Sequence, residues 1–263
     1  ETLYKKSADK MKRYADQAYK TSGLSANKYM ENVTGFSASL LSSLKGDTNK
    51  AAEAANTAMI DMSDNANKMG TSMESIQMAY QGFAKQNYTM LDNLKLGYGG
   101  TKTEMERLLA DAKKITGVKY NINNLADVYS AIHVIQNKLD ITGTTAKEAA
   151  TTFTGSFAAM KASAQNVLGR LSLGQDIKPA LNGLASTVST FLFGNLMPMI
   201  GNILVGLPSM ITTFIQSAAP SFIKNGKSLI TSLINGIITG YPVMIEGIRG
   251  LMSQIISWII SEF

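Results

Sequence analysis

Few residues of this chain combine the side-chain type and the spacing that catalysis or metal binding requires. Its 263 residues include no cysteine and a single histidine, His133. The lack of cysteine excludes disulfide bridges, thiolate nucleophiles and cysteine-containing zinc sites. His133 lies one helical turn after Tyr129 and has no second histidine with which to share a metal ion. We therefore expect His133 to be a packing residue rather than a ligand or a general base.

Two other patterns are weak candidates for chemistry. Residues 97–100 read Gly-Tyr-Gly-Gly, but neither dinucleotide-binding nor Walker spacing follows, and no strand is expected before them. We interpret this segment as a break between helices. Glu104 and Glu106 fit the start of a helix, where the helix dipole favours negative charge. The sequence predicts no catalytic residue, no metal site, no cofactor and no enzymatic activity.

The distribution of charge divides the chain into parts that face different environments. Residues 1–178 contain 22 of the 25 basic and 17 of the 19 acidic residues, and 179–263 contain only five charged residues. We expect three segments: a helical, coiled-coil-like segment over 1–69, a charged helical region over 70–178, and an apolar segment punctuated by proline over 179–263.

The charged part of the chain reads as a series of helices. Hydroxyl residues followed by glutamate three positions later predict helix starts at Thr71, Thr101 and Thr145. Gly70 and Gly117 predict helix ends. The expected helices cover residues 1–21, parts of 25–69, about 71–96, 101–116, 123–139 and 145–173.

The fold class expected is all-α. No alternating run of β-branched residues occurs, so we expect no sheet. The molecule should be elongated, with multiple helices, Gly and Pro breaks between them, and coiled-coil or helical-bundle association.

The apolar segment contains a 22-residue repeat. Residues 220–241 align with 242–263, and each unit begins with proline. Because proline fits the first turn of a helix but not its interior, we expect successive amphipathic helices rather than one continuous span. An apolar stripe along these helices is the candidate surface for self-association or membrane contact. The stripe consists of Phe222, Ile223, Leu229, Ile230, Leu233, Ile234, Ile237, Ile238, Met244, Ile245, Ile248, Leu251, Ile255, Ile256, Ile259 and Ile260.

The composition of 179–263 leaves two environments open. A transmembrane helix needs ~20 mainly apolar residues. The window 191–210 is uncharged but contains two prolines, and the window 241–260 contains Glu246 and Arg249. Both are poor constitutive spans, yet both are too apolar for a solvated surface. Burial against protein in a resting state and residence in a bilayer are the two alternatives.

Three stretches resemble a known family. Residues 75–105 (SIQMAYQGFAKQNYTMLDNLKLGYGGTKTEM), 131–136 (AIHVIQ) and 141–150 (ITGTTAKEAA) are similar to the tail tape measure proteins of tailed phages, or phage-like particles, of Gram-positive bacteria. The resemblance covers about 70–170. The flanking segments fit the family in character only, and the family's long coiled-coil ruler and peptidoglycan hydrolase domain have no counterpart in the sequence.

The resemblance implies a virion structural protein. Several parallel copies, often three, would occupy the lumen of the tail tube, and their length would set the length of the tail. The implied partners are other copies in a homotrimer, tail tube and tail-tip proteins, tail assembly chaperones, and the end of the genome DNA without sequence specificity. On infection the copies would leave the tube and help DNA to cross the host membrane. The glycine breaks favour a position near the tail tip.

Two other classes remain as alternatives. A pore-forming or membrane-disrupting helical protein would share the apolar segment but not the sequence of 75–105. A nucleic-acid binder would require a basic face, and the net charge of +6 is spread among interleaved acids.

Overall fold

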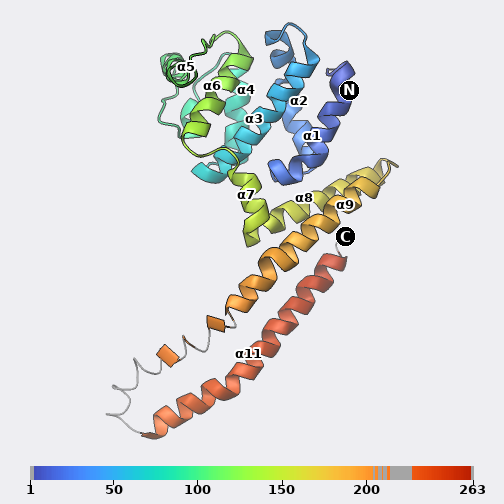
Figure 1. Ribbon diagram of the computed structural model, residues 1–263, viewed down its shortest axis with the longest axis vertical. Helices are drawn as coiled ribbons and strands as arrows, with labels where there is room; N and C mark the ends of the chain where they lie inside the picture. The colour runs from blue at the N-terminus through green and yellow to red at the C-terminus, as the bar shows by residue number, and fades with distance from the viewer. Residues whose placement is uncertain (1–2, 204, 207–208, 210–211, 214–226, 262–263) are drawn as a thin grey trace. The chain divides into compact units, whose positions relative to one another are not determined.

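The computed structural model describes residues 3–203, 205–206, 209, 212–213 and 227–261. Its described residues form helices joined by short loops and include no strand, which confirms the all-α fold class (Figure 1). Coiled-coil association stays a prediction. The elements are η1 (Lys5–Ser7), α1 (Ala8–Thr21), α2 (Ala26–Ser43), α3 (Thr48–Met69), α4 (Met73–Phe83), η2 (Leu91–Leu94), α5 (Lys102–Thr116), α6 (Leu125–Lys138), α7 (Thr144–Thr151), α8 (Phe153–Ser172), α9 (Lys178–Ser189), η3 (Thr190–Leu196) and α11 (Lys227–Ser261).

The chain separates into two compact units, Glu1–Leu196 and Met197–Phe263. These units do not coincide with the three segments inferred from composition. Helices from both 1–69 and 70–178 build one unit, and this unit also takes in α9 and η3 from the apolar segment.

The core of the first unit lies among α1–α6. Its centre is an aromatic group from α2, α4 and α6, in which the ring of Tyr129 lies 5.5 Å from Phe36, edge to face, and 4.9 Å from Tyr80. The hydroxyl of Tyr129 donates to the carbonyl of Tyr80 at 2.8 Å, so the buried polar end of the ring is satisfied. Alanines of α3, such as Ala51 and Ala55, are fully buried, and their small side chains allow the neighbouring helices to pack closely around α3.

Several helix boundaries confirm the sequence predictions. Gly70 and Gly117 end α3 and α5 with positive φ of 66° and 74°, a conformation that glycine adopts without strain. Thr101 caps α5, and its side chain accepts from the backbone N–H of Glu104. Helix α6 covers Leu125–Lys138, close to the expected 123–139.

The helix expected over 71–96 is wrong at both ends. Ser72 rather than Thr71 caps α4, because the Thr71 hydroxyl donates instead to the carbonyl of Asn93 at 3.0 Å. Helix α4 ends at Phe83. The Asn87 side chain then accepts from both the N–H and the hydroxyl of Thr89, and such local bonds compete with helical hydrogen bonding.

The helix expected over 145–173 is two helices. Helix α7 ends at Thr151, and the side chain of Thr152 starts α8 by accepting from the N–H of Gly155 at 3.0 Å. The N-cap of α7 is Gly143, and no side chain of its own segment caps it. The capping acceptor comes from α3, as described below.

The expectation of successive helices headed by proline is wrong at Pro242. Helix α11 is a single 35-residue helix that includes Pro242 in its interior (Figure 1). The repeat length is compatible with one helix, because 22 residues make about 6.1 turns at 3.6 residues per turn. Matching positions within the described residues, such as Ile238 and Ile260, therefore lie on the same side of the helix. The hydrogen bond that proline removes is a local cost within a long helix.

Candidate functional site

Helix α11 contains the residues of the predicted apolar stripe from Leu229 to Ile260. Ile238, Leu251, Ile256 and Ile260 are exposed, with Ile260 at 72 %. Phe222 and Ile223 lie outside the described residues, as do the side chains of Leu229, Ile230, Leu233 and Ile259. The half-buried members are Ile234, Ile237, Met244, Ile245, Ile248 and Ile255.

The two charged residues near the middle of α11 form an ion pair. Arg249 Nη1 lies 3.3 Å from Glu246 Oε1, one turn apart, and both side chains are largely exposed. Mutual neutralisation leaves the described part of this helix with little net charge, although an exposed pair of this kind contributes little stability.

A second apolar element begins in the first unit. Among the described residues, Lys178–Ile203 is a helical stretch of 26 residues that is long and apolar enough to cross a membrane, by length and composition alone. It starts with α9 and η3. A core helix of a soluble protein can be equally long and apolar, but it is mostly buried. In Lys178–Ile203, only 28 % of the most apolar window is buried. Phe193 is 67 % exposed, so part of this apolar surface faces outward within the first unit.

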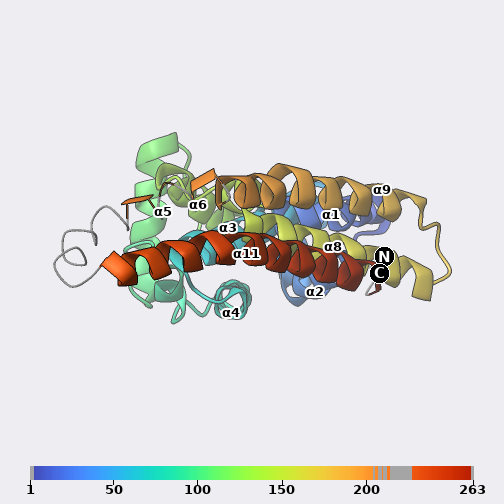
Figure 2. The same ribbon diagram turned by 90° about the horizontal axis from the view of Figure 1, so that it is seen from below.

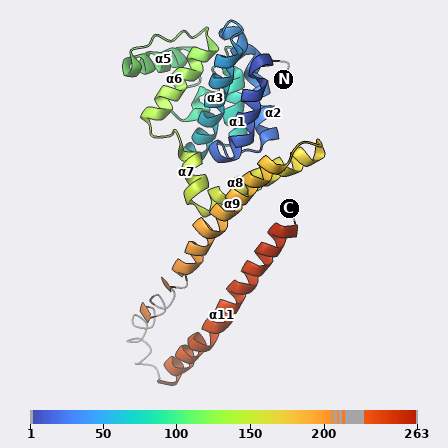
Figure 3. The same cartoon turned by 45° about the vertical axis from the view of Figure 1, so that its right-hand side comes forward.

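Helices α7, α8, α9 and the π-helical turn η3 form a second group within the first unit, which we call the hairpin module (residues 144–196). Helices α8 and α9 lie side by side in all three ribbon views (Figures 1, 2 and 3). The module packs on α1, α2 and α3. We call this contact the seam.

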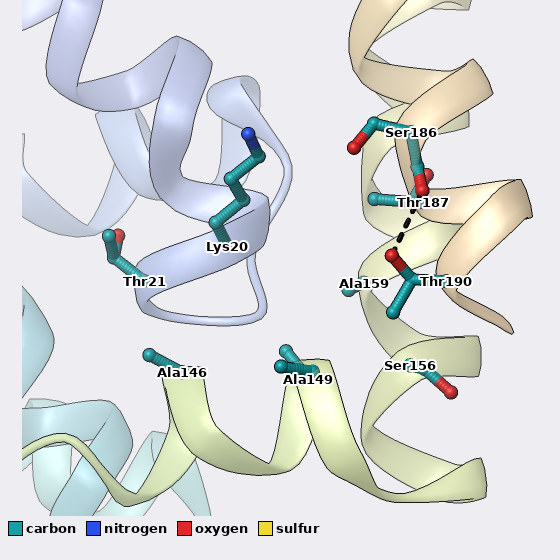
Figure 4. Close-up of a pocket in the computed structure, with 10 residues that line it drawn as sticks. Lys20, Thr21, Ala146, Ala149, Ser156, Ala159, Ser186, Thr187 and Thr190 are labelled. Atoms are coloured by element: carbon teal, nitrogen blue, oxygen red, sulfur yellow. Dashed lines mark hydrogen bonds between the residues drawn. The ribbon is translucent and has the colours of Figure 1, made fainter. Parts of the chain in front are cut away.

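A cavity of about 300 Å³ opens at the seam (Figure 4). Its walls come from the end of α1, from α7, α8 and α9. They consist mainly of alanine methyl groups with serine and threonine hydroxyls, and Lys20 is the charged residue among those that line it. In Figure 4, the drawn hydrogen bond joins the Thr190 hydroxyl to the carbonyl of Ser186, within α9 and η3. The cavity therefore presents small side chains and no convergent catalytic group.

Polar contacts hold the seam closed. The carboxylate of Asp64, on α3, accepts from the backbone N–H groups of Gly143 at 2.6 Å and Thr145 at 2.8 Å. A carboxylate at a helix N-terminus satisfies orphan donors and complements the helix dipole. This contact supplies the cap that α7 lacks within its own segment.

Two further contacts cross the seam. The side-chain oxygen of Asn166, on α8, accepts from the N–H of Ala26 at 2.7 Å, in the first turn of α2. Arg170 donates to Asp16 at 2.6 Å from α8 to α1, and both side chains are partly buried. The start of α7 is thus capped by Asp64 from the other side of the seam, and the start of α2 receives a cap from Asn166 of the module.

The Asp61–His133 pair joins α3 to α6. Asp61 Oδ1 lies 2.8 Å from His133 Nδ1, and the carboxylate is 1 % exposed whereas the imidazole is 37 % exposed. Burial raises the pKa of Asp61 to about 6, against the opposing hydrogen bond from His133. The same hydrogen bond raises the pKa of His133 above its usual value.

The partners of these two carboxylates were not predicted from the sequence. His133 is a packing residue only in part, because it partners a buried acid. A signal was present: Asp61 and Asp64 are three residues apart and lie next to Met59 and Met62, which have the same spacing, so the two aspartates share the buried face of α3. The residues that the pattern singled out, Glu104 and Glu106, lie on α5 away from the core, where Glu106 is exposed and Glu104 is half-buried. Glu104 pairs with Arg107 there and accepts from the N–H of Gly99.

No family model matches this chain, and neither a curated protein nor a solved structure matches it. Among the described residues, no group of three or more His, Asp or Glu side chains is placed to hold a metal ion. The candidate functional features are the exposed apolar residues of α11 and η3 and the polar contacts of the seam.

Proposed function

We propose that this chain is a segment of a tail tape measure protein from a tailed phage, or phage-like particle, of Gram-positive bacteria. The observation that carries the proposal is the sequence of residues 75–105, which occurs in the same all-helical chain as a 35-residue apolar helix. The chain would act as a virion structural protein near the tail tip. It would contribute to tail assembly and length, and it would be released at infection.

The apolar helices give this proposal its physical mechanism. In the tail, α11 and the surface around Phe193 would be covered by sister copies or tail-tip proteins, because exposed apolar patches drive association. After release the same residues would enter a bilayer, where apolar side chains regain their burial. The pairing of Glu246 with Arg249 lowers the cost of bringing this helix to an apolar medium.

The location of the chain is the test of the proposal. Antibodies raised against the full chain are applied to purified tails, followed by electron microscopy of gold label on intact and detergent-opened particles. We expect label at the tail tip or within opened tubes, in fixed stoichiometry to the tube protein by quantitative mass spectrometry. Absence of the chain from purified tails overturns the proposal.

The exposed apolar residues of α11 favour a second candidate, a pore-forming or membrane-disrupting protein. Both functions predict membrane binding, so binding does not separate them. A protein of this second class would release dye from vesicles on its own and would be absent from tails.

Membrane binding tests the shared mechanism through a matched pair of variants of the full chain. Ile238→Asp with Ile260→Asp places two charges on exposed positions of α11, and Ile115→Asp with Val118→Asp places two on exposed positions of the first unit. Because burying each isoleucine is worth about 1.5–3 kcal/mol, the α11 variant should bind phosphatidylcholine vesicles at least about tenfold more weakly. The control variant should bind as the parent does. Equal losses in both variants, or none in either, would rule out α11 as the membrane element.

A further inference from the structure

The hydrophobic core of the first unit ends at Ile141. The continuous cluster of buried apolar residues runs from Tyr4 to Ile141 and includes side chains of every helix from α1 to α6. Buried apolar residues of the hairpin module, such as Met160, Phe191 and Leu196, lie outside this cluster. The seam therefore separates two hydrophobic groups within one compact unit.

The hairpin module has internal contacts of its own. The rings of Phe153 and Phe157 lie 5.2 Å and 5.3 Å from that of Phe191, which joins α8 to η3. Hydroxyls of Ser163 and Thr187 form a hydrogen bond at 2.6 Å between α8 and α9. These contacts would persist if the module left the other helices.

Open clefts run along the seam. They have volumes of about 300, 160 and 200 Å³, and each is lined by residues from both sides. Atoms that line an open cleft face water instead of protein, so the two sides make no packing contacts there. Polar contacts across the seam include the hydrogen bonds of Asp64 and Asn166 and the ion pair of Arg170 with Asp16, whose groups can bond to water instead.

A short connection joins the module to α6. Residues 139–143 link the two groups, and two of them have positive φ, Asp140 at 54° and Gly143 at 83°. A change of backbone conformation in this connection would reorient the whole module without unfolding a helix.

We propose that the hairpin module opens from helices α1–α6 as one body, at a lower free energy than the unfolding of the core. The connection 139–143 serves as the hinge, and Asp64, Asn166 and Arg170 serve as the latch. Cooperative opening of such sub-global units is a general property of proteins. The inference stands on the seam alone and does not depend on the proposed function.

The amides that donate across the seam report on this opening. The N–H groups of Gly143 and Thr145 are bonded to Asp64, and that of Ala26 is bonded to Asn166. In native-state hydrogen exchange of the full chain, we expect these three amides to exchange through an opening that leaves Met62, in the core of α3, protected. Exchange of the three at the rate and denaturant dependence of Met62 overturns the proposal.

A disulfide lock distinguishes opening of the module from fraying of the individual helix ends. A Cβ atom at Gly169 would lie 3.8 Å from Cγ of Asn27 across the seam, so Asn27→Cys with Gly169→Cys places two cysteines opposite each other, and oxidation is used to join them. The natural chain has no cysteine, so these are the only thiols. Oxidation should slow exchange of Gly143 and Thr145 at least about tenfold relative to Met62, and reduction of the same variant should restore it. No relative slowing in the oxidised form shows local fraying and overturns the proposal.

A pair of arginine variants provides a second test that keeps the core intact. Arg170→Ala removes the ion pair with Asp16 across the seam, and Arg107→Ala removes an ion pair with Glu104 within α5. We expect Arg170→Ala to speed exchange of Ala26, Gly143 and Thr145 about three- to tenfold. Arg107→Ala should leave these amides unchanged. Equal effects of the two variants contradict an opening at the seam.

Discussion

At the scale of the residue, two buried carboxylates of α3 have different partners and different consequences. Asp64 accepts two backbone N–H groups and holds the start of α7, whereas Asp61 pairs with the half-exposed imidazole of His133. The second carboxylate oxygen of Asp61 has no hydrogen-bond partner among the described residues. Because an unsatisfied buried charge is costly, protonation of this pair changes stability.

The Asp61–His133 pair should make the fold less stable as the pH rises. Asp61 has a folded pKa of about 6, above its ordinary value of 3.8, and the pKa of His133 is raised as well. The native state therefore binds more protons than the unfolded chain. The contribution of the pair is fully present below about pH 4 and is lost as the pH rises through 6 and then through the pKa of His133.

Replacement of Asp61 by asparagine keeps the shape of the side chain and removes its charge. Urea unfolding followed by circular dichroism between pH 4 and 7.5 should show a flatter pH dependence for Asp61→Asn than for the parent. The difference should amount to at most roughly 3 kcal/mol. Asp111→Asn is the control, because the pKa of Asp111 is lowered by Lys114 and its contribution is lost only as the pH falls. A parent-like pH profile in Asp61→Asn contradicts this assignment.

At the scale of the element, the break between α7 and α8 depends on close approach of two backbones. A Cβ atom at Gly155 would lie 2.4 Å from the carbonyl oxygen of Glu148, which is shorter than any ordinary contact. Glycine at this position therefore permits the turn that aims α8 along the seam. Alanine is intrinsically the better helix former, so helix propensity and packing predict opposite effects.

The packing effect should outweigh the propensity effect at Gly155. Gly155→Ala should lower the free energy of unfolding by about 1–3 kcal/mol, because overpacking against backbone forces the helices apart. Gly194→Ala serves as the matched control in η3, where an added Cβ meets only Thr190 Cγ2 at 3.9 Å. This control should be neutral or more stable by up to about 1 kcal/mol. Chemical denaturation of both variants at one pH decides between the two effects.

Local chemistry made many elements predictable from the sequence. Gly70 and Gly117 end helices because glycine adopts positive φ, and Thr101 starts α5 because its side chain accepts from the backbone. Each of these effects is local and does not depend on the rest of the chain. The sequence predicts the start of α7 to within one residue, but not its cap, because Asp64 is 79 residues away from Gly143 in sequence. The continuity of α11 was not predicted, because proline normally ends a helix, whereas the register of the repeat is compatible with one continuous helix. An interaction between distant segments decides the first case, and the periodicity of a single segment decides the second.

One candidate surface could be predicted from a single segment, and the other depends on how distant segments pack. Periodicity predicts an apolar stripe in the residues of α11, since such a stripe is a property of a single segment, although it was expected on successive helices rather than on one. The seam could not be inferred, because small residues such as Ala149 and Ala159 indicate neither a core nor a cavity until the packed helices are known. The partnership of His133 with Asp61 likewise depends on the contact of α3 with α6.

At the scale of the whole molecule, charge and apolar surface belong to different parts of the chain. Residues 1–178 contain 22 basic and 17 acidic residues, a net charge of +5, and residues 179–263 contain only five charged residues. Electrostatic attraction to an anionic membrane would come from the first part and would be screened by salt. Apolar burial would come from the second part and would be nearly independent of moderate salt.

These two contributions can be separated by vesicle composition. The full chain should bind neutral phosphatidylcholine vesicles with less than about a twofold change in affinity between 50 and 500 mM salt, because apolar burial contains no screened charge term. Vesicles with added phosphatidylserine should bind more tightly at low salt and lose that advantage at high salt, as the charge of residues 1–178 is screened. Sedimentation of the chain with vesicles measures both affinities. Loss of binding to neutral vesicles at high salt would show that charge rather than the apolar helices drives membrane contact, and the proposed role of α11 would then be wrong.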